Sequence, residues 1–215
     1  MRIAMLGTGM VGRTLGAKLR ELGHEVTMGS RSGDNPEALA WAEGVGARVA
    51  TFADAAEGAE LLFNATNGGG SLAAIDSCDD SALDGKVLVD VANPLDFSQG
   101  FPPSLSIVNT DSLGERIQAA HPELRVVKTF NTVSAPVMVQ PSLVPGHHNL
   151  FLCGNDAGAK AQVASLQQTF GWPAEDLLDL GDITMARGVE MYLPLWVRLF
   201  GAVGTPNFNV HIARG

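Results

Sequence analysis

Cysteine and positive charge are scarce in this sequence of 215 residues. Its two cysteines, Cys78 and Cys153, lie far apart and form no CxxC pair or Cys/His cluster, so they suit a reducing compartment as unpaired core thiols and offer no zinc site. The 14 lysines and arginines are outnumbered by 23 aspartates and glutamates, which gives a formal net charge of -9. Because such a field repels phosphate backbones and anionic lipid surfaces, we expect no nucleic-acid partner.

Long apolar runs are also lacking. The apolar run within residues 1–7 is too short for a secretion signal. The most apolar later stretch, residues 185–203, contains Arg187, Glu190, Pro194 and Arg198, so it falls short of a membrane span. We therefore expect a cytoplasmic protein with no membrane partner, and we interpret this stretch as a buried helix.

Residue types that usually carry acid or base chemistry are few. The only tyrosine is Tyr192, and Trp196 stands four residues later, so the Tyr-x-x-x-Lys pair of short-chain dehydrogenases is absent. None of the four lysines lies in the expected C-terminal helix, where a β-hydroxyacid dehydrogenase would need its catalytic base. None of the five histidines has a carboxylate partner at a telling spacing. The sequence thus predicts no catalytic side chain and no metal site.

What the sequence does contain is an alternation of short apolar runs with helical periodicity. The expected strands are residues 2–6, 24–28, 48–50, 60–66, 86–91, 126–130 and 150–153, and the expected helices are residues 14–22, 36–43, 113–120 and 157–170. Since parallel strands need crossover helices between them, this order predicts an α/β fold with a doubly wound, mostly parallel sheet. After residue 171, an acidic connector over residues 175–182 leads to a largely apolar helix over residues 183–200.

The turn after the first expected strand carries the spacing G-x-G-x-x-G. The motif consists of Gly7, Thr8, Gly9, Met10, Val11 and Gly12. Its three glycines suit a tight turn, a close approach of the backbone to a pyrophosphate, and the packing of helix on strand. Because the motif lies between an expected strand and an expected helix, whose first amides can receive phosphates, we interpret it as the dinucleotide site of a Rossmann-type fold.

The end of the second expected strand indicates which dinucleotide is bound. An NAD enzyme places an Asp or Glu about twenty residues beyond the motif, on the ribose 2′-hydroxyl. This chain has Ser30, Arg31 and Ser32 there. Hydroxyls and a guanidinium suit a 2′-phosphate, which a carboxylate would repel, so we predict NADP(H) as the cofactor. The predicted organisation is an NADP-binding Rossmann domain over residues 1–171 and a small C-terminal helical segment over residues 172–215.

Several motifs taken together resemble one family. They are Gly-Thr-Gly-Met-Val-Gly, Gly-Ser-Arg-Ser, Asn93-Pro94-Leu95, the run Val-Lys-Thr-Phe-Asn-Thr-Val over residues 127–133, and Gly181-Asp182 followed by Ala186-Arg187-x-x-Glu190. Over nearly the whole chain, the sequence resembles the NADPH-dependent F420 reductases (F420H2:NADP+ oxidoreductases) and their relatives in the cytosolic domain of STEAP metalloreductases.

The resemblance implies where two reacting cofactors would bind. Residues 8–11 would hold the pyrophosphate, and residues 30–32 would hold the 2′-phosphate. The nicotinamide half would be flanked by Asn67, Ala92, Asn93 and Pro94, and the second ring would be bordered by Asn131, Thr132 and Val133. These positions follow expected strands, and ligands of open α/β sheets bind at the carboxyl ends of strands.

The implied activity is hydride transfer between NADP(H) and F420, or a related flavin-type acceptor that binds as a small-molecule substrate. It agrees with the lack of acid and base residues, because the chemistry then belongs to the cofactors. Two alternatives are an NADP(H)-binding redox-sensing module without turnover and a flavin-assisted metal reductase. Imine reduction of the pyrroline-5-carboxylate type would need a larger helical dimer domain than residues 172–215 supply.

The expected helix over residues 183–200 is apolar on all sides. One face carries Met185, Val189, Tyr192, Trp196 and Leu199, and the opposite face carries Leu193, Leu195 and Val197. Pro194 would lie in the middle of this helix and bend it. Since exposed apolar patches usually mark an interface, we expect a homodimer through this helix, as the family resemblance also implies. The alternative is a monomer whose tail, residues 204–215, folds back over it.

Overall fold

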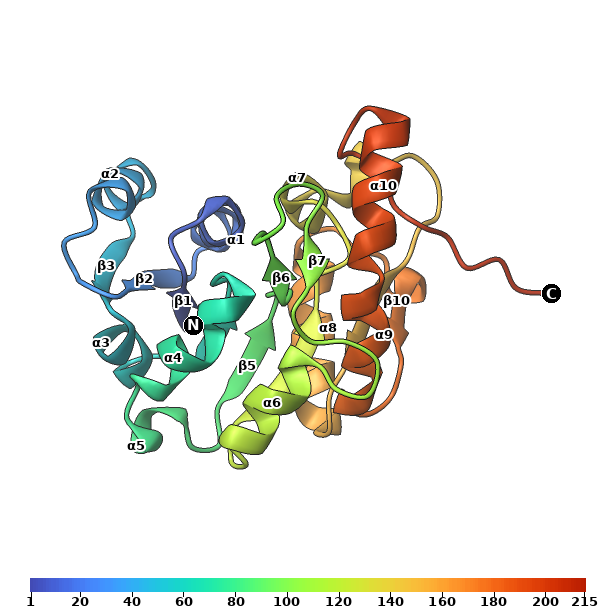
Figure 1. Ribbon diagram of the computed structural model, residues 1–215. Helices are drawn as coiled ribbons and strands as arrows, with labels where there is room; N and C mark the ends of the chain where they lie inside the picture. Colours follow the sequence, from blue (N-terminus) through green and yellow to red (C-terminus); the bar gives the residue numbers. More distant parts are fainter.

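The computed structural model describes residues 1–215 and places eight strands in one sheet (Figure 1). In spatial order they are β10 (Leu177–Asp179), β9 (Leu150–Cys153), β8 (Arg125–Thr129), β5 (Val87–Asp90), β4 (Leu61–Asn64), β1 (Arg2–Leu6), β2 (Glu25–Ser30) and β3 (Arg48–Thr51). In this sheet β8, β5, β4, β1, β2 and β3 are all parallel to one another, whereas β9 is antiparallel to β8 and β10 is parallel to β9. The predicted Rossmann-type, mostly parallel α/β fold is confirmed.

Ten α-helices connect and follow these strands. They are α1 (Met10–Glu21), α2 (Pro36–Val45), α3 (Phe52–Glu57), α4 (Ser71–Asp76), α5 (Asp80–Leu83), α6 (Leu113–Ala120), α7 (Ala135–Val139), α8 (Ala157–Thr169), α9 (Ala186–Met191) and α10 (Leu193–Val203). Short 3-10 turns are η1 (Gly68–Gly70), η2 (Pro141–Leu143), η3 (Ala174–Asp176) and η4 (Ile183–Met185), and a hairpin is formed by β6 (Leu95–Asp96) and β7 (Ser104–Leu105).

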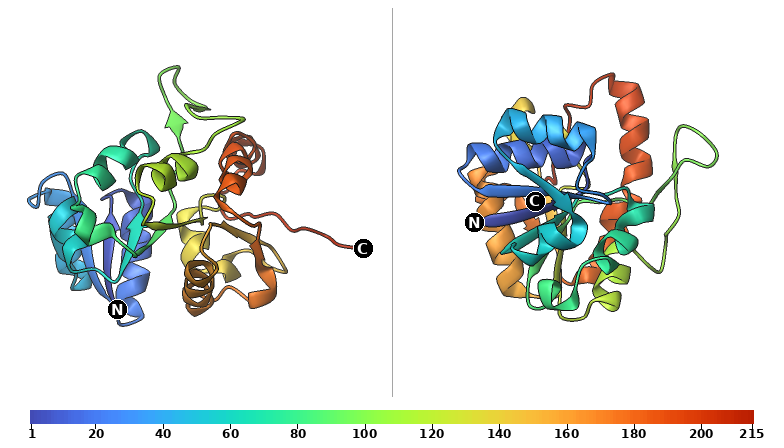
Figure 2. Two further views of the ribbon diagram at one scale, coloured as in Figure 1. Left: turned by 90° about the horizontal axis from the view of Figure 1, so that it is seen from below. Right: turned by 90° about the vertical axis from the view of Figure 1, so that its left-hand side faces the viewer.

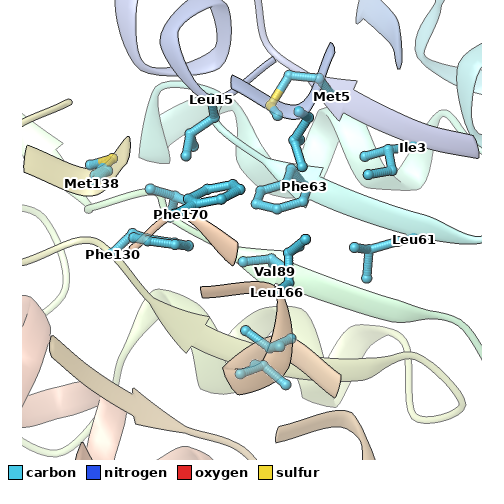
Figure 3. Packing of buried hydrophobic residues seen from close by; sticks show 14 of the residues in the cluster. Ile3, Met5, Leu15, Leu61, Phe63, Val89, Phe130, Met138, Leu166 and Phe170 are labelled. Atoms are coloured by element: carbon cyan, nitrogen blue, oxygen red, sulfur yellow. The ribbon is translucent and has the colours of Figure 1, made fainter. Parts of the chain in front are cut away.

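The sheet is buried on both faces, and alternate residues of each strand belong to opposite cores. In β1, Ile3 and Met5 pack with residues of α1, α7 and α8, whereas Ala4 and Leu6 pack with residues of α3 to α6. Figure 3 shows the first of these cores, in which Phe63 of β4 lies beside Phe170. This two-sided burial fixes the directions of the strands and therefore the positions of their carboxyl ends, where ligands bind in such sheets.

Two features project from the sheet and its helices. The β6–β7 hairpin extends out of the body on the same side as α10, and the chain beyond α10 runs away from it as a tail (Figure 2). The tail is attached at its middle, because Val210 O accepts a hydrogen bond of 2.8 Å from Asn149 N and the ring of Phe208 stacks on Trp196. No helix of the structure has both the length and the apolar character that crossing a membrane would require.

The region after residue 171 differs from expectation in two ways. Its acidic connector contains β10, which pairs with β9, so the sheet extends into the segment expected to be helical. The expected single helix is divided into η4, α9 and α10. Because α9 and α10 are separated at Tyr192, Pro194 stands in the first turn of α10 and not in mid-helix. This position suits proline, because the first amides of a helix have no partner within it.

The predicted faces of this segment are partly wrong for the same reason. Met185, expected on the packed face, is 42% exposed, and Leu193, expected on the outer face, is 9% exposed. Leu195 is 55% exposed, as expected of the outer face. Met185 belongs to the 3-10 turn η4, whose period differs from that of the expected α-helix, so its side chain need not follow the expected face.

Candidate functional site

A cavity of about 810 Å³ opens at the carboxyl edge of the sheet, where β1, β2 and β4 end. Three sequence segments predicted to bind the cofactor contribute to its lining. From these segments the lining includes Gly7, Thr8, Gly9, Ser30, Arg31, Ser32 and Asn67. The structure thus brings together residues that lie up to sixty positions apart in the sequence. Met10, Val11 and Gly12 follow them in the first turns of α1.

The glycine turn has the geometry that its spacing predicts. Gly7 has a φ of +118°, and a Cβ there would lie 2.5 Å from Ala65 O. A Cβ on Gly12 would lie 2.3 Å from Gly7 O, so this glycine lets α1 pack on the turn. A Cβ on Gly9 would meet no atom within 4 Å. The first and third glycines are therefore required by the fold, whereas the second faces open space beside the cavity.

The N-terminus of α1 offers free hydrogen-bond donors to that space. Its N-cap, Gly9, provides no side-chain cap, and the first turn contains no acidic residue. The first amides of a helix have no intrahelical acceptor, and the helix dipole makes this end partly positive. With twelve residues and no capping carboxylate, α1 fits a pyrophosphate at its first turn.

The far end of the cavity is suited to a second anion. Ser30 is 6% exposed and its hydroxyl donates to Ser32 O, which holds the turn after β2 in shape. Arg31 is exposed, takes part in no ion pair, and is the only charged residue that lines the cavity. An unpaired guanidinium with hydroxyl groups beside it and no carboxylate in the lining fits a 2′-phosphate.

Of the residues predicted to flank the nicotinamide, only Asn67 lines the cavity, and Ala92, Asn93 and Pro94 lie next to it. Asn67 lines the cavity, and its side chain accepts a hydrogen bond from Gly69 N. A Cβ on Gly68 would lie 2.1 Å from Asn93 O, so the turn formed by η1 packs directly against the segment after β5. Ala92 and Pro94 are buried behind that turn.

The residues predicted to border the second ring are buried. Asn131, Thr132 and Val133 are 4%, 2% and 5% exposed. The side chain of Asn131 connects Asn93 with the carbonyl oxygen of Val189 in α9. The hydroxyl of Thr132 has no hydrogen-bond partner. Their role at an acceptor stays a prediction, and what the structure shows is that Asn131 joins the end of β8 to the end of β5.

The comparisons with known proteins agree with this geometry. A crystal structure from Arthrobacter sp. FB24, of a protein provisionally assigned as an F420-dependent NADP reductase, is 53% identical, covers 100% of both chains and has a TM-score of 0.94. The family model described as NADP oxidoreductase, coenzyme F420-dependent, matches residues 2–94. The chain belongs to this family. This family consists of NADP-dependent oxidoreductases, and the resemblance predicted from the sequence is confirmed.

Two other relatives define how far the likeness extends. The metalloreductase STEAP3 of Rattus norvegicus is 29% identical over 199 residues, which are 91% of this chain, and the chain spans 38% of that protein's length. A reductive aminase from Aspergillus terreus, solved with NADPH and ethyl levulinate, is 18% identical, covers 94% of this chain and 62% of its own, and has a TM-score of 0.67. The latter likeness shows the fold alone.

One polar cluster in this family member was missed by the sequence analysis. Lys128 Nζ lies 2.9 Å from Asp90 Oδ2 and 2.8 Å from Glu190 Oε1, and all three side chains are completely or almost completely buried. Burial alone would lower the pKa of Lys128, but the two carboxylates raise it above its usual value, so the lysine is charged. The signal was present in the sequence: Asp90 is the last residue of one apolar strand and Lys128 the last but one of another, and the register of β5 and β8 pairs them.

Two histidines also have carboxylate partners that the sequence did not reveal. His121 Nε2 lies 2.9 Å from Asp76 Oδ1, and His147 Nδ1 lies 3.3 Å from Asp176 Oδ1. Neither pair lines the cavity at the carboxyl edge. They are therefore structural contacts, and the cavity itself contains no histidine, lysine or carboxylate.

Proposed function

We propose that this protein transfers hydride between NADP(H) and the deazaflavin F420 or a related flavin-type acceptor. The observation that carries the proposal is the cavity itself. Its lining unites the glycine turn, the Ser-Arg-Ser segment and Asn67, and its only charged residue is Arg31. This arrangement suits an elongated ligand with phosphate groups at both the glycine turn and the Ser-Arg-Ser segment. The family, and the Arthrobacter relative provisionally assigned as an F420-dependent NADP reductase, support the choice of acceptor.

When bound, the nicotinamide supplies or accepts the hydride, and the chain itself needs to bind, orient and exclude water. The α1 amides hold the pyrophosphate, and Arg31 with its neighbouring hydroxyls holds the 2′-phosphate. The η1 turn and the Asn93–Pro94 segment then fix the direction in which the rest of the cofactor leaves the cavity. The reduced acceptor also takes up one proton, and water can supply it to a ring nitrogen, since the lining contains no titratable group other than Arg31.

The acceptor is identified by NADPH oxidation followed spectroscopically with F420, FMN, FAD and a ferric chelate in separate assays. Fast oxidation with F420 supports the proposal, and fast oxidation with a flavin alone assigns the related acceptor. Turnover that requires both a flavin and the ferric chelate would indicate a metal reductase, which the STEAP3 relation favours as a second candidate. Tight NADPH binding without turnover with any of them would contradict the oxidoreductase proposal and indicate a sensing module.

We also propose that the protein is a homodimer through α10. Apolar side chains remain exposed along this helix and at its start: Met191 is 37%, Leu195 is 55%, Phe200 is 37% and Val203 is 53% exposed. The tail covers only part of the helix, through the contact of Phe208 with Trp196. A second copy would cover the remaining surface by a two-fold contact, in which the same patch meets itself.

A further inference from the structure

A buried group of three charges lies under the carboxyl edge of the sheet, outside the cavity. Asp90, Lys128 and Glu190 have side chains that are 0%, 0% and 1% exposed. Lys128 Nζ bonds both carboxylates and also donates to Ala92 O. Two acidic side chains and one ammonium give this triad a formal net charge of -1, which is unusual for groups wholly removed from water.

The triad is connected to the wall of the cavity by hydrogen bonds. Thr66, which lines the cavity, donates through Oγ1 to Asn64 Oδ1 at 2.7 Å. Asn64 Nδ2 donates in turn to Asp90 Oδ1 at 2.8 Å. On the other side, the carbonyl group bonded by Lys128 belongs to Ala92, directly before Asn93. The triad therefore supports both segments between which we place the nicotinamide half of the cofactor.

The other groups around the triad leave its excess negative charge in place. Glu190 accepts hydrogen bonds from the amides of Leu113 and Gly114 at 2.8 and 3.1 Å, so the N-terminus of α6 offsets part of the charge. The nearby Arg187 of α9 is paired with Glu115 and adds no net charge. No further cation contacts either carboxylate of the triad.

We propose that Asp90, Lys128 and Glu190 are positioning residues that favour the oxidised cofactor, NADP+, over NADPH at this site. The nicotinamide ring carries a positive charge in NADP+ and none in NADPH. A net negative charge behind the segments between which we place the ring would therefore stabilise only the oxidised form and make the bound NADPH a stronger hydride donor. Because this inference rests on the proposed function, its test separates loss of cofactor binding from a change in redox preference.

The size of the effect follows from electrostatics in the protein interior. The interaction between two charges falls inversely with their distance and with the effective dielectric constant, which is about 20 inside a protein. Because α6 also offsets part of the charge, we expect the triad to change the equilibrium only roughly three- to tenfold. The measured quantity is the ratio of the dissociation constants (Kd) of NADP+ and NADPH. A merely structural role for the triad would change both constants together and leave this ratio unchanged.

The main variant is Glu190→Gln, which removes one negative charge and keeps an oxygen for the α6 amides. We expect its Kd for NADP+ to rise roughly three- to tenfold while its Kd for NADPH stays nearly constant. Asp90→Asn should act in the same direction, and Lys128→Met should act in the opposite one. Titration calorimetry with each cofactor gives both constants, and circular dichroism establishes that each variant is folded.

Two matched controls isolate the buried charge. Glu123→Gln makes the same chemical change on an exposed residue in the turn before β8, at the opposite end of that strand, and should leave the ratio unchanged. Ser112→Ala removes the N-cap of α6 without altering the charge of the triad, so it should lower stability but not change the ratio.

An unchanged ratio in a folded Glu190→Gln or Asp90→Asn variant would overturn the inference, as would an equal loss of affinity for both cofactors. If neither single variant folds, the triple variant Asp90→Asn, Lys128→Met and Glu190→Gln decides, because it removes all three buried charges together and leaves no unpaired ion. An unchanged ratio in this variant would then refute the role of the triad. Failure of the wild type to bind either cofactor would instead refute the proposed function.

Discussion

Asn93, which is half-buried, and Asn131, which is buried, form a reciprocal pair across the ends of β5 and β8. Asn93 Nδ2 donates to the backbone oxygen of Asn131 at 2.9 Å, and Asn131 Nδ2 donates to Asn93 Oδ1 at 3.0 Å. The same nitrogen of Asn131 donates to Val189 O at 3.0 Å. This pair and the adjacent triad of Asp90, Lys128 and Glu190 attach α9 to the edge of the sheet on which the cofactor is proposed to bind.

We predict that Asn131→Ala lowers the free energy of unfolding by about 2 to 3 kcal/mol, because it leaves the Asn93 and Val189 oxygens without a donor in a buried place. Urea denaturation measures the loss. Asn207→Ala, on the exposed tail, is the control and should change stability by no more than about 0.5 kcal/mol. Equal stability of Asn131→Ala and wild type would show that these hydrogen bonds are replaced at no cost.

We predict that Arg31→Ala lowers the preference for NADPH over NADH roughly 10- to 100-fold, since charged hydrogen bonds to a phosphate are worth about 1.5 to 3 kcal/mol each. The affinity for NADH should hardly change, because NADH has no 2′-phosphate. Arg48→Ala removes another exposed arginine, one that pairs with Glu25 and does not line the cavity, and it should keep the wild-type preference. The assay is titration of both cofactors, and full preference in Arg31→Ala would be incompatible with the assigned role.

Two glycine variants should separate binding from folding. Gly9→Val is expected to abolish NADPH binding and to keep a wild-type circular dichroism spectrum, because its side chain enters the open space next to the α1 amides. Gly12→Val is expected to unfold or strongly destabilise the protein, because its Cβ would collide with Gly7 O. Retained NADPH affinity in a folded Gly9→Val variant would mean that the glycine turn serves the fold alone.

Stability should depend on pH through Glu115. Hydrogen bonds from Arg187 in α9, followed by one from Ser112, hold the pKa of Glu115 below its usual value of 4.5. A lowered folded pKa means that the pair stabilises the protein above pH 4.5 and that this contribution is lost as the pH falls through the folded pKa. Glu115→Gln should thus be less stable than wild type at neutral pH, and the difference should shrink in thermal melts taken at progressively lower pH. A difference that stays constant with pH would contradict this account.

The dimer proposal is tested at α10. Leu195→Glu places a charge on a side chain that is 55% exposed, so it should convert the dimer to a monomer with little loss of thermal stability. Light scattering at micromolar concentration provides the masses, with 22.5 kDa for one chain. A wild-type protein that scatters only as a single chain would leave the tail as the sole cover of α10. Arg198→Glu is the control, because it also introduces a negative charge at an exposed position of α10 but removes no apolar side chain, and it should leave the dimer intact.

Much of the N-terminal half could be predicted from the sequence because its signals are local. The apolar run of β1, the glycine turn and the periodic leucines of α1 lie within about twenty consecutive residues, and the carboxyl end of β2 follows at the spacing typical of the fold. The family model matches this same region, residues 2–94. The cavity could be predicted because most of the residues proposed to bind the cofactor belong to these local motifs.

What escaped prediction depends on contacts between distant segments. Helices α3, α4 and α5 have only four to six residues and show no full period of apolar positions, so tertiary packing decides them. The strand β10 lies among acidic residues and is recognisable only by its pairing with β9. The buried triad combines β5, β8 and α9, and no motif of neighbouring residues encodes it.

The reversal of strand direction between β8 and β9 separates the chain into two parts that should differ in how substitutions affect cofactor binding. Because β9 and β10 end at the opposite edge of the sheet, α8 begins there, and its first turn is capped by Asp156, which bonds Ala159 N at 2.6 Å. Although α8 is as long as α1, its amides face away from the cofactor edge. Substitutions between Leu150 and Asp179 can therefore adjust stability without altering the choice of cofactor, which makes this stretch the natural place to redesign the protein for heat resistance.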